Sequence, residues 1–320
     1  AGKEDRIRIV LNGVQIHCSD SAAIYARQQG KLILSLEPGS QNILSDGTAY
    51  VYDSADSDEP SAALYSKDDL TINGTGSLTV SGNCNDAITC KDHLVIVEGG
   101  FDIQSADDGV IGRDSLTVLG GDFTLDVQGD GFKTTNDTDS SKGWMNLTGG
   151  SFTITAGADG FQAETDLTIS GGDYTLITGG GSVNSSSGSE SDGMGGIWGH
   201  WQQSSETEEA PSAKGIKAAS ALTISGGSFS IDSSDDALHT NGVMTISDGC
   251  FIISSGDDGA HADTSLAISG GTFHISKSYE GIESADIALS GGDISITASD
   301  DGINVAGGND SSALGGRPGQ

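Results

Sequence analysis

Apolar and polar residues alternate along most of this chain in short bursts with a period of two. In residues 222–231, for example, the order LTISGGSFSI places apolar side chains at every second position on each side of a Gly-Gly pair. Such alternation is typical of a strand with one buried face. Gly-Gly, Asp-Gly or Ser-Asp pairs separate the bursts, and glycine allows the tight corners that short strands need. No window shows helical spacing, so the pattern predicts an all-β protein.

The bursts recur in units of about 22 residues over residues 214–306. The equivalent positions are Lys214, Asp236, Asp258, Glu280 and Asp301, which are separated by 22, 22, 22 and 21 residues. Each unit contains three strand-like bursts. A repeat of this length stabilises a fold in which every unit buries its apolar face against the next. We therefore expect a single-stranded, right-handed parallel β-helix.

The same register extends toward the N-terminus at Asp86, Asp108, Asp130 and Asp159, whereas residues 7–85 repeat less regularly. A continuous solenoid has no internal boundary, so we expect one domain over residues 1–308 with about 12 coils of roughly 22 residues.

One spacing is much longer than a coil. Asp159 and Lys214 are 55 residues apart, and the excess lies in a Gly- and Ser-rich stretch. This composition predicts a flexible insertion at about residues 179–213, and residues 309–320 resemble a disordered linker.

The charge balance excludes several kinds of partner. The chain has 14 Lys and Arg against 46 Asp and Glu, a formal net charge of −32. This charge argues against nucleic acid and against an anionic membrane surface, because both are polyanions. No apolar run is long enough for membrane insertion. Four cysteines are too few for a disulfide scaffold, so we expect free buried thiols, with a Cys84–Cys90 pair across one corner as the alternative. The Ser, Thr, Asn and Gly content suits a secreted or bacterial cell-surface protein, which we expect to be a monomer.

Acidic residues recur at one corner of the repeat. Stacked coils would bring these like charges to about 5 Å, so the corner needs either solvation or a cation. Calcium prefers six to eight oxygen ligands, and Asp-Gly corners offer carboxylates and carbonyls. Turn formation explains a single Asp equally well, but the consecutive pairs favour calcium. The candidate ligands are Asp107, Asp108, Asp130, Asp235, Asp236, Asp257, Asp258, Glu280, Asp300 and Asp301.

A second set of positions lies three residues after each anchor, and we call it the stripe. It consists of Thr89, Ile111, Lys133, Gln162, Lys217, His239, His261, Glu283 and Asn304. Because neighbouring positions are apolar, we expect most of the stripe to face solvent. His239, His261 and Glu283 would then form a polar floor for sugar hydroxyls or a plain solvated face. A transition-metal site formed by the two histidines and Asp263 is a weaker alternative, because the ligand spacing is not close.

Two tryptophans lie close together in the predicted insertion. Trp198 and Trp201 are set among Gly, Ser and Glu residues. An exposed indole ring can pack against a sugar ring, whereas a buried one would pin the loop to the solenoid. Both interpretations stay open.

Several motifs together resemble a known family. The run KGIKA, TISGG, DDALH, SGDDGAHAD, KSYEGIE and ASDDGIN, with DDLTINGTGSLTV upstream, is similar to secreted bacterial carbohydrate-binding-domain proteins. The resemblance implies a right-handed parallel β-helix similar to polysaccharide lyases of family nine. It also implies bound calcium and affinity for plant cell-wall polysaccharide, including acidic pectin and cellulose. The positions that carry over as calcium ligands are Asp235, Asp236, Asp257, Asp258, Glu280, Asp300 and Asp301.

Three functions compete on this basis. The first is calcium-dependent polysaccharide binding without turnover, which the acidic corner and the resemblance favour. The second is a pectate lyase, in which Lys217 or Lys133 would remove the α-proton of a uronate. Surrounding carboxylates raise the pKa of a lysine, which works against a base role. The third is a surface adhesin, for which a solenoid alone would suffice.

Overall fold

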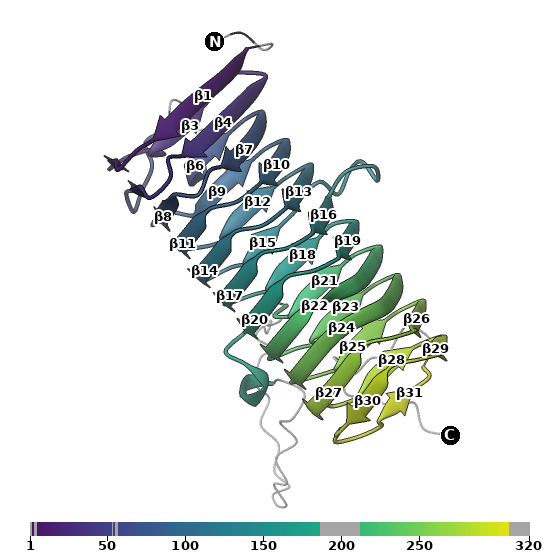
Figure 1. Ribbon diagram of the computed structural model, residues 1–320. Helices are drawn as coiled ribbons and strands as arrows, with labels where there is room; N and C mark the ends of the chain where they lie inside the picture. Colours follow the sequence, from purple (N-terminus) through teal and green to yellow (C-terminus); the bar gives the residue numbers. More distant parts are fainter. Residues whose placement is uncertain (1, 3–4, 53, 55–56, 186–211, 307–320) are drawn as a thin grey trace, which may run out of the picture.

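The computed structural model describes residues 2, 5–52, 54, 57–185 and 212–306, and these form a parallel β-helix (Figure 1). The strands of each coil belong to three rows, and every row runs along the length of the rod (Figure 1). All strand pairs are parallel, and their register is regular except for local shifts near Ser225 and Ser254. The predicted all-β solenoid is therefore confirmed. Its short third row has eleven strands, close to the expected number of coils.

The first two rows belong to one sheet, because β22 and β24 each run through both rows. The first row consists of β1 (Arg6–Leu11), β4 (Lys31–Leu36), β7 (Asp69–Asn73), β10 (His93–Ile96), β13 (Ser115–Val118), β16 (Trp144–Leu147), β19 (Asp166–Ile169), the first part of β22 (Ala221–Ser233), the first part of β24 (Val243–Ser255), β26 (Ser265–Ile268) and β29 (Ile287–Leu289). The second row consists of β2 (Gln15–Cys18), β5 (Gln41–Asp46), β8 (Ser77–Gly82), β11 (Gly100–Ser105), β14 (Asp122–Val127), β17 (Ser151–Ala156), β20 (Asp173–Thr178), the second parts of β22 and β24, β27 (Thr272–Lys277) and β30 (Asp293–Ile296).

The third row is a separate sheet of short strands. It consists of β3 (Ile24–Ala26), β6 (Ala62–Ser66), β9 (Asp86–Cys90), β12 (Val110–Gly112), β15 (Phe132–Lys133), β18 (Phe161–Ala163), β21 (Ile216–Ala218), β23 (Leu238–Thr240), β25 (Ala260–Ala262), β28 (Ile282–Ser284) and β31 (Ile303–Asn304). The single helical turn within the described residues is a 3-10 helix, η1 (Ser182–Asn184). None of the described helical residues forms a segment long and apolar enough to cross a membrane.

Stacked aromatic rings form the centre of the core. One aromatic residue from each of seven consecutive coils in the second row lies on its equivalent, with ring centroids 4.4–4.9 Å apart. The seven residues are Phe101, Phe123, Phe152, Tyr174, Phe229, Phe251 and Phe273. Phe132 and Phe161 meet this column edge-on from the third row. Buried aromatic residues combine a large apolar area with favourable ring geometry, so this column joins the coils along the rod.

The segment predicted as a flexible insertion lies only partly within the described residues. At its start, the Ser182 N–H donates to Asp232 Oδ1 at 2.7 Å and the Ser185 hydroxyl donates to the Gly256 carbonyl at 2.7 Å. At its end, Thr178 Oγ1 donates to the Ala213 carbonyl at 2.8 Å. Residues 186–211, with Trp198 and Trp201, lie outside the described part, as does the predicted linker at 309–320. The four cysteines are free thiols, as expected, but only Cys90 is buried.

The aromatic column predicts a large cost for removing one ring. Phe152→Ala should destabilise the fold by about 3–5 kcal/mol, because it leaves a cavity between two stacked neighbours. Thr153→Ala, at an exposed position of the same strand, is the control and should change stability by less than about 0.5 kcal/mol. Urea unfolding measures both variants. Equal midpoints would show that the column does not hold the coils together.

Candidate functional site

The acidic corner connects the second row to the third, and it is mostly a buried structural feature. The buried set comprises Asp86, Asp108, Asp130, Asp159, Asp236, Asp258 and Glu280. In most coils, one carboxylate oxygen accepts the backbone N–H of the equivalent residue one coil later. Asp130 N–H donates to Asp108 Oδ1 at 2.7 Å, and Asp258 N–H donates to Asp236 Oδ1 at 2.9 Å. The corner carboxylates thus bond each coil to the next.

Lysine side chains neutralise part of this carboxylate ladder. Lys133 Nζ lies 3.0 Å from Asp108 and 2.7 Å from Asp130, and Lys214 Nζ lies 2.7 Å from Asp235 and 3.0 Å from Asp236. Lys217 Nζ lies 3.4 Å from Asp159. Although burial disfavours the ammonium form, Asp130 and Asp108 raise the pKa of Lys133. A lysine held charged in this way is poorly suited to act as a base.

The predicted calcium ligands do not form one continuous set. Asp107 and Asp108 come together with Asp86, and Asp235, Asp236 and Asp257 form a second group. In each group the ligand atoms lie within 4.8 Å of one another. Asp86 was not among the predicted ligands, although its register with Asp108 is visible in the sequence. Asp130 is instead paired with Lys133.

The last coil contributes less to the corner than expected. Asp300 and Asp301 are exposed, and neither belongs to a potential metal group within the described residues. Glu280 is buried, and Asn304 Nδ2 donates to its Oε1 at 2.6 Å. The predicted ladder of ligands therefore ends before the C-terminal coil, because no described coil covers that end (Figure 1).

Most of the stripe faces outward, because it alternates with buried neighbours in β18, β21, β23 and β25, but its positions are more covered than expected. Thr89, Ile111 and Glu283 are buried, and the other six positions are half-buried. The strands of the third row are only two to five residues long, so the corner next to them lies within reach of stripe side chains. Most of the stripe side chains contact corner carboxylates, among them those of Thr89, Lys133, Lys217, His239, His261 and Asn304. The stripe is thus a partner of the corner and not a separate polar floor.

The two histidines of the stripe stack and face carboxylates. Their ring centroids are 5.1 Å apart, and His239 Nδ1 lies 2.8 Å from Asp236 Oδ2. His261 has a carboxylate at each nitrogen, with Asp258 3.0 Å from Nδ1 and Asp263 3.0 Å from Nε2. Glu283 Oε2 lies 3.4 Å from the same Nδ1. Burial lowers the pKa of His261, but Asp258 and the other nearby carboxylates outweigh it and raise this pKa to about 10.

These histidines and carboxylates form two further groups that could hold a metal ion. One is Asp236, His239 and His261, and the other is Asp258, His261 and Glu283. The weakly predicted partner Asp263 bonds to the second ring nitrogen of His261 and belongs to neither group.

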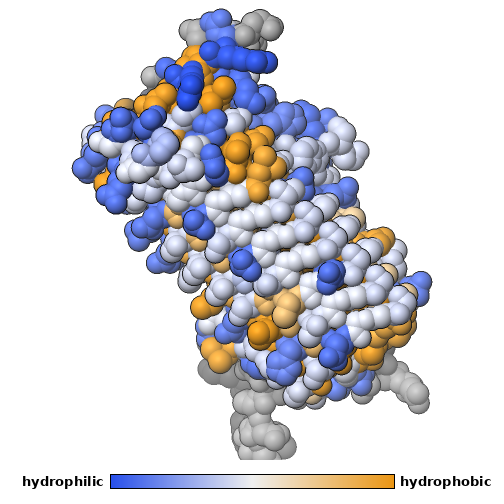
Figure 2. Space-filling model, in the orientation of Figure 1, coloured by the Kyte–Doolittle hydropathy of each residue, from blue (hydrophilic) through white to orange (hydrophobic). Residues whose placement is uncertain are grey.

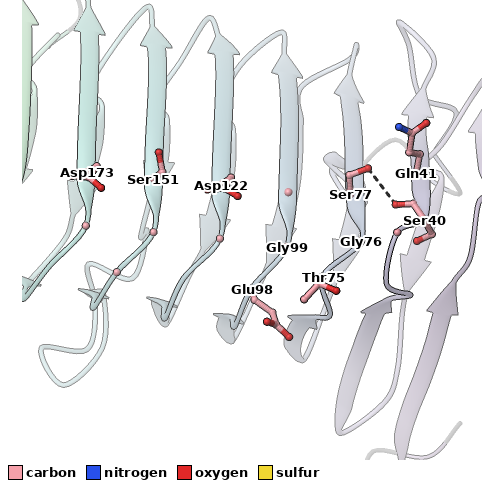
Figure 3. Close-up of a pocket in the computed structure, with 16 residues that line it drawn as sticks. Ser40, Gln41, Thr75, Gly76, Ser77, Glu98, Gly99, Asp122, Ser151 and Asp173 are labelled. Carbon is pink, nitrogen blue, oxygen red and sulfur yellow. Dashed lines mark hydrogen bonds between the residues drawn. The ribbon is translucent and has the colours of Figure 1, made fainter.

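A long polar groove follows the Gly-Gly corner between the first and second rows. It has a volume of about 800 Å³ and crosses six coils, from Ser40 to Asp173 (Figure 3). Asp122, Ser151 and Asp173 line it in register as the first residues of consecutive strands (Figure 3). The repeated Gly-Gly pairs marked this corner in the sequence, but only as turns. Glycine is required there, since Gly121 has φ 117° and a Cβ would lie 2.9 Å from the Gly99 carbonyl oxygen.

The visible face of the central coils is neither strongly polar nor strongly apolar (Figure 2). On β17, the outward positions are Ser151, Thr153 and Thr155, which alternate with buried residues. Such a face offers many hydroxyl groups for hydrogen bonds.

The architecture is that of a parallel β-helix. The sequence profile of the carbohydrate-binding domain-containing protein family matches residues 1–259, and the chain belongs to this family. A carbohydrate-binding domain-containing protein from Acetivibrio thermocellus is 36% identical over 104 residues, which cover 32% of this chain and 36% of that protein. The chain thus spans little more than a third of this relative.

A solved structure shows the same relationship. It is a polysaccharide lyase-like protein from C. thermocellum, determined as a gadolinium derivative, with 34% identity and a TM-score of 0.54. The match covers 56% of this chain and 72% of the other. The family and the fold expected from the sequence are both confirmed.

The buried carboxylate of Asp86 predicts a specific pH dependence. Burial, then the neighbouring Asp108, raises the pKa of Asp86 from 3.8 to about 7. The neutral acid therefore favours the fold, and this stability is present below about pH 4 and lost as the pH rises through 7. Asp86→Asn is neutral at every pH and retains an acceptor for Thr89 Oγ1. In the presence of chelator, the free energy of unfolding of Asp86→Asn should exceed that of the wild type by up to a few kcal/mol at pH 8. Near pH 4 the two values should be equal.

Urea unfolding across this pH range measures the difference. Asp102→Asn, at an exposed position of β11, is the matched control and should leave the pH profile unchanged. If the free energies of unfolding of wild type and Asp86→Asn changed with pH in the same way, Asp86 would not have a raised pKa in the folded state.

Proposed function

We propose that this protein binds plant cell-wall polysaccharide outside the cell without cleaving it. It holds acidic pectin through calcium bound by Asp235, Asp236 and Asp257. The observation that carries this proposal is Asp257 Oδ1, which is buried and lacks a hydrogen-bond partner within the described residues. Burial, then Asp236 and Asp258, raises the pKa of Asp257 to about 8. Such an excess of carboxylate favours a cation.

The residues fit the preferences of calcium. Three carboxylates lie within ligand range of each other, and calcium accepts further oxygen ligands from carbonyls, water or a uronate. Lys214 neutralises Asp235 and Asp236, but Asp257 has no lysine or arginine partner within the described residues. A calcium ion would supply the missing charge.

Calcium would also solve the problem of like charges. A chain at −32 repels a polyuronate, so hydrogen bonds alone would act against an unfavourable field. A divalent ion on the corner reverses the local sign and offers an open ligand position to a uronate carboxylate.

The same contacts argue against turnover. A lyase needs a neutral base beside the substrate, whereas Lys133 bridges two carboxylates and Lys217 contacts Asp159 and Ser212. Both lysines thus serve the stability of the corner.

Removing one ligand tests the acidic part of the proposal. Asp257→Asn should weaken calcium-dependent retention on polygalacturonate at least about tenfold, the effect of 1.4 kcal/mol. Calcium should raise the melting temperature of the wild type, and much less that of the variant, because ligand binding stabilises only the native state. Asp248→Asn, at an exposed corner on another face, is the matched control.

Two results would oppose this assignment. Retention that survives chelation would exclude a calcium bridge. Release of unsaturated sugars would establish a lyase, and loss of that release in Lys217→Ala would identify its base.

The groove supports a second ligand, a neutral β-glucan such as cellulose. Its six coils span roughly 24 Å, enough for several sugar rings in line. Its lining of serines, backbone glycines and acidic side chains offers hydrogen bonds but repels anions. A neutral chain rich in hydroxyl groups suits such a surface, and a polyuronate does not.

A substitution inside the groove separates the two ligands. Ser151→Leu places a bulky apolar side chain in the groove and should reduce retention on cellulose several-fold while pectin retention stays unchanged. Thr223→Leu, at an exposed position of β22 outside the groove, is the control. Pull-down on cellulose and on calcium pectate measures both. Unchanged cellulose retention in Ser151→Leu would place the glucan elsewhere or exclude it as a ligand.

A further inference from the structure

We propose that Asp258, His261 and Glu283 form a site for a first-row transition-metal dication such as Zn²⁺, separate from the calcium ligands. His261 in β25 and Glu283 in β28 are paired in register on adjacent coils, and Asp258 lies at the corner of the His261 coil. This inference does not rest on pectin binding.

The distances match those between neighbouring ligands of one metal ion. His261 Nδ1 lies 3.0 Å from Asp258 Oδ2 and 3.4 Å from Glu283 Oε2. Zinc bonds of about 2.0–2.2 Å in tetrahedral geometry place two ligand atoms about 3.4 Å apart. All three ligand atoms lie within 4.8 Å of one another. One ion can therefore reach all three with little movement of the side chains.

The far side of the imidazole is arranged as in many metal-bound histidines. Asp263 Oδ1 lies 3.0 Å from His261 Nε2, where it accepts the ring N–H. This contact favours the tautomer with its lone pair at Nδ1, directed toward Asp258 and Glu283. Two carboxylates facing a lone pair require a positive charge between them. That charge is either a proton, held by His261 or by Glu283, or a metal ion.

Two of the proposed ligands are held in place before any ion binds. Asp258 Oδ1 accepts the Glu280 N–H at 3.2 Å, so Oδ2 is the oxygen left for a ligand. Glu283 is only 3% exposed. His261 retains 16% side-chain exposure, which leaves room for water or a sugar hydroxyl at a remaining ligand position.

The local charge distinguishes this site from the rest of the corner. Elsewhere in the register a lysine meets the carboxylates, as Lys133 does for Asp108 and Asp130. Among the described residues, His261 is the only basic side chain in an ion pair with Asp258 or Glu283. An imidazole nitrogen favours zinc, cobalt or nickel over calcium.

The experiment uses the whole chain without a purification tag, stripped with chelator and then supplied with excess calcium. Titration calorimetry with Zn²⁺ should detect one site that calcium does not fill. Co²⁺ should produce visible absorption bands characteristic of an inner-sphere nitrogen ligand. Binding should weaken at lower pH, because the metal competes with the proton on His261.

Three variants locate the site. Glu283→Gln keeps the shape of the buried side chain and should weaken Zn²⁺ binding at least about tenfold. Asp263→Asn should weaken it by about 10–100-fold, the usual effect of losing a partner behind a histidine ligand. His274→Asn, which removes an exposed histidine on β27, should bind as the wild type does.

Other outcomes would overturn the proposal. These are no Zn²⁺ binding in excess calcium, unchanged affinity in Glu283→Gln, or loss of affinity in His274→Asn. If Glu283→Gln fails to fold, the partly exposed Asp263→Asn decides, and unchanged affinity there rejects the site. Pectin retention can be lost or kept in any of these cases, so the two proposals fail separately.

Discussion

The structure depends on the parallel register that places each residue directly over its equivalent in the previous coil. This register stacks Phe152 between Phe123 and Tyr174, and it also stacks Asp236 over Asp258. Stacking is favourable for rings because it buries apolar area in a preferred geometry. For carboxylates it is unfavourable, because it brings like charges together. The stacked carboxylates of the acidic corner therefore need hydrogen-bond donors or cations beside them.

The protein neutralises its acidic corner in different ways along the rod. Backbone N–H groups donate hydrogen bonds to the corner carboxylates in most coils, and lysines add a full positive charge near Asp108, Asp130 and Asp236. Farther along, the stripe changes to His261 and then Glu283, and the carboxylates outnumber their cations. Both proposed metal sites lie at this change. The same carboxylates thus serve the fold in one region and remain available to ions in another.

The two proposed sugar-binding surfaces differ for the same physical reason. The acidic corner is made of side chains and repels anions unless a cation is present. The groove forms because glycines, paired in four of its six coils, leave one edge of the rod without side chains. It therefore presents backbone and hydroxyl groups to a neutral chain. The same repeat therefore forms both the acidic corner and the groove along one rod.

The sequence by itself determined the architecture, because period-two alternation and a 22-residue repeat leave few ways to bury Leu222, Phe229 and Leu238 together. It also located the corner that carries Asp236 and Asp258. The tertiary structure decided which of these carboxylates bond to the next coil and which lack partners, since that depends on side-chain direction across coils. It also decided how far Glu283 is covered, because the side chain lies against His261 of the previous coil and loses contact with solvent there. The tertiary structure also showed that the Gly-Gly corners line a groove, because a groove forms only when several coils are stacked.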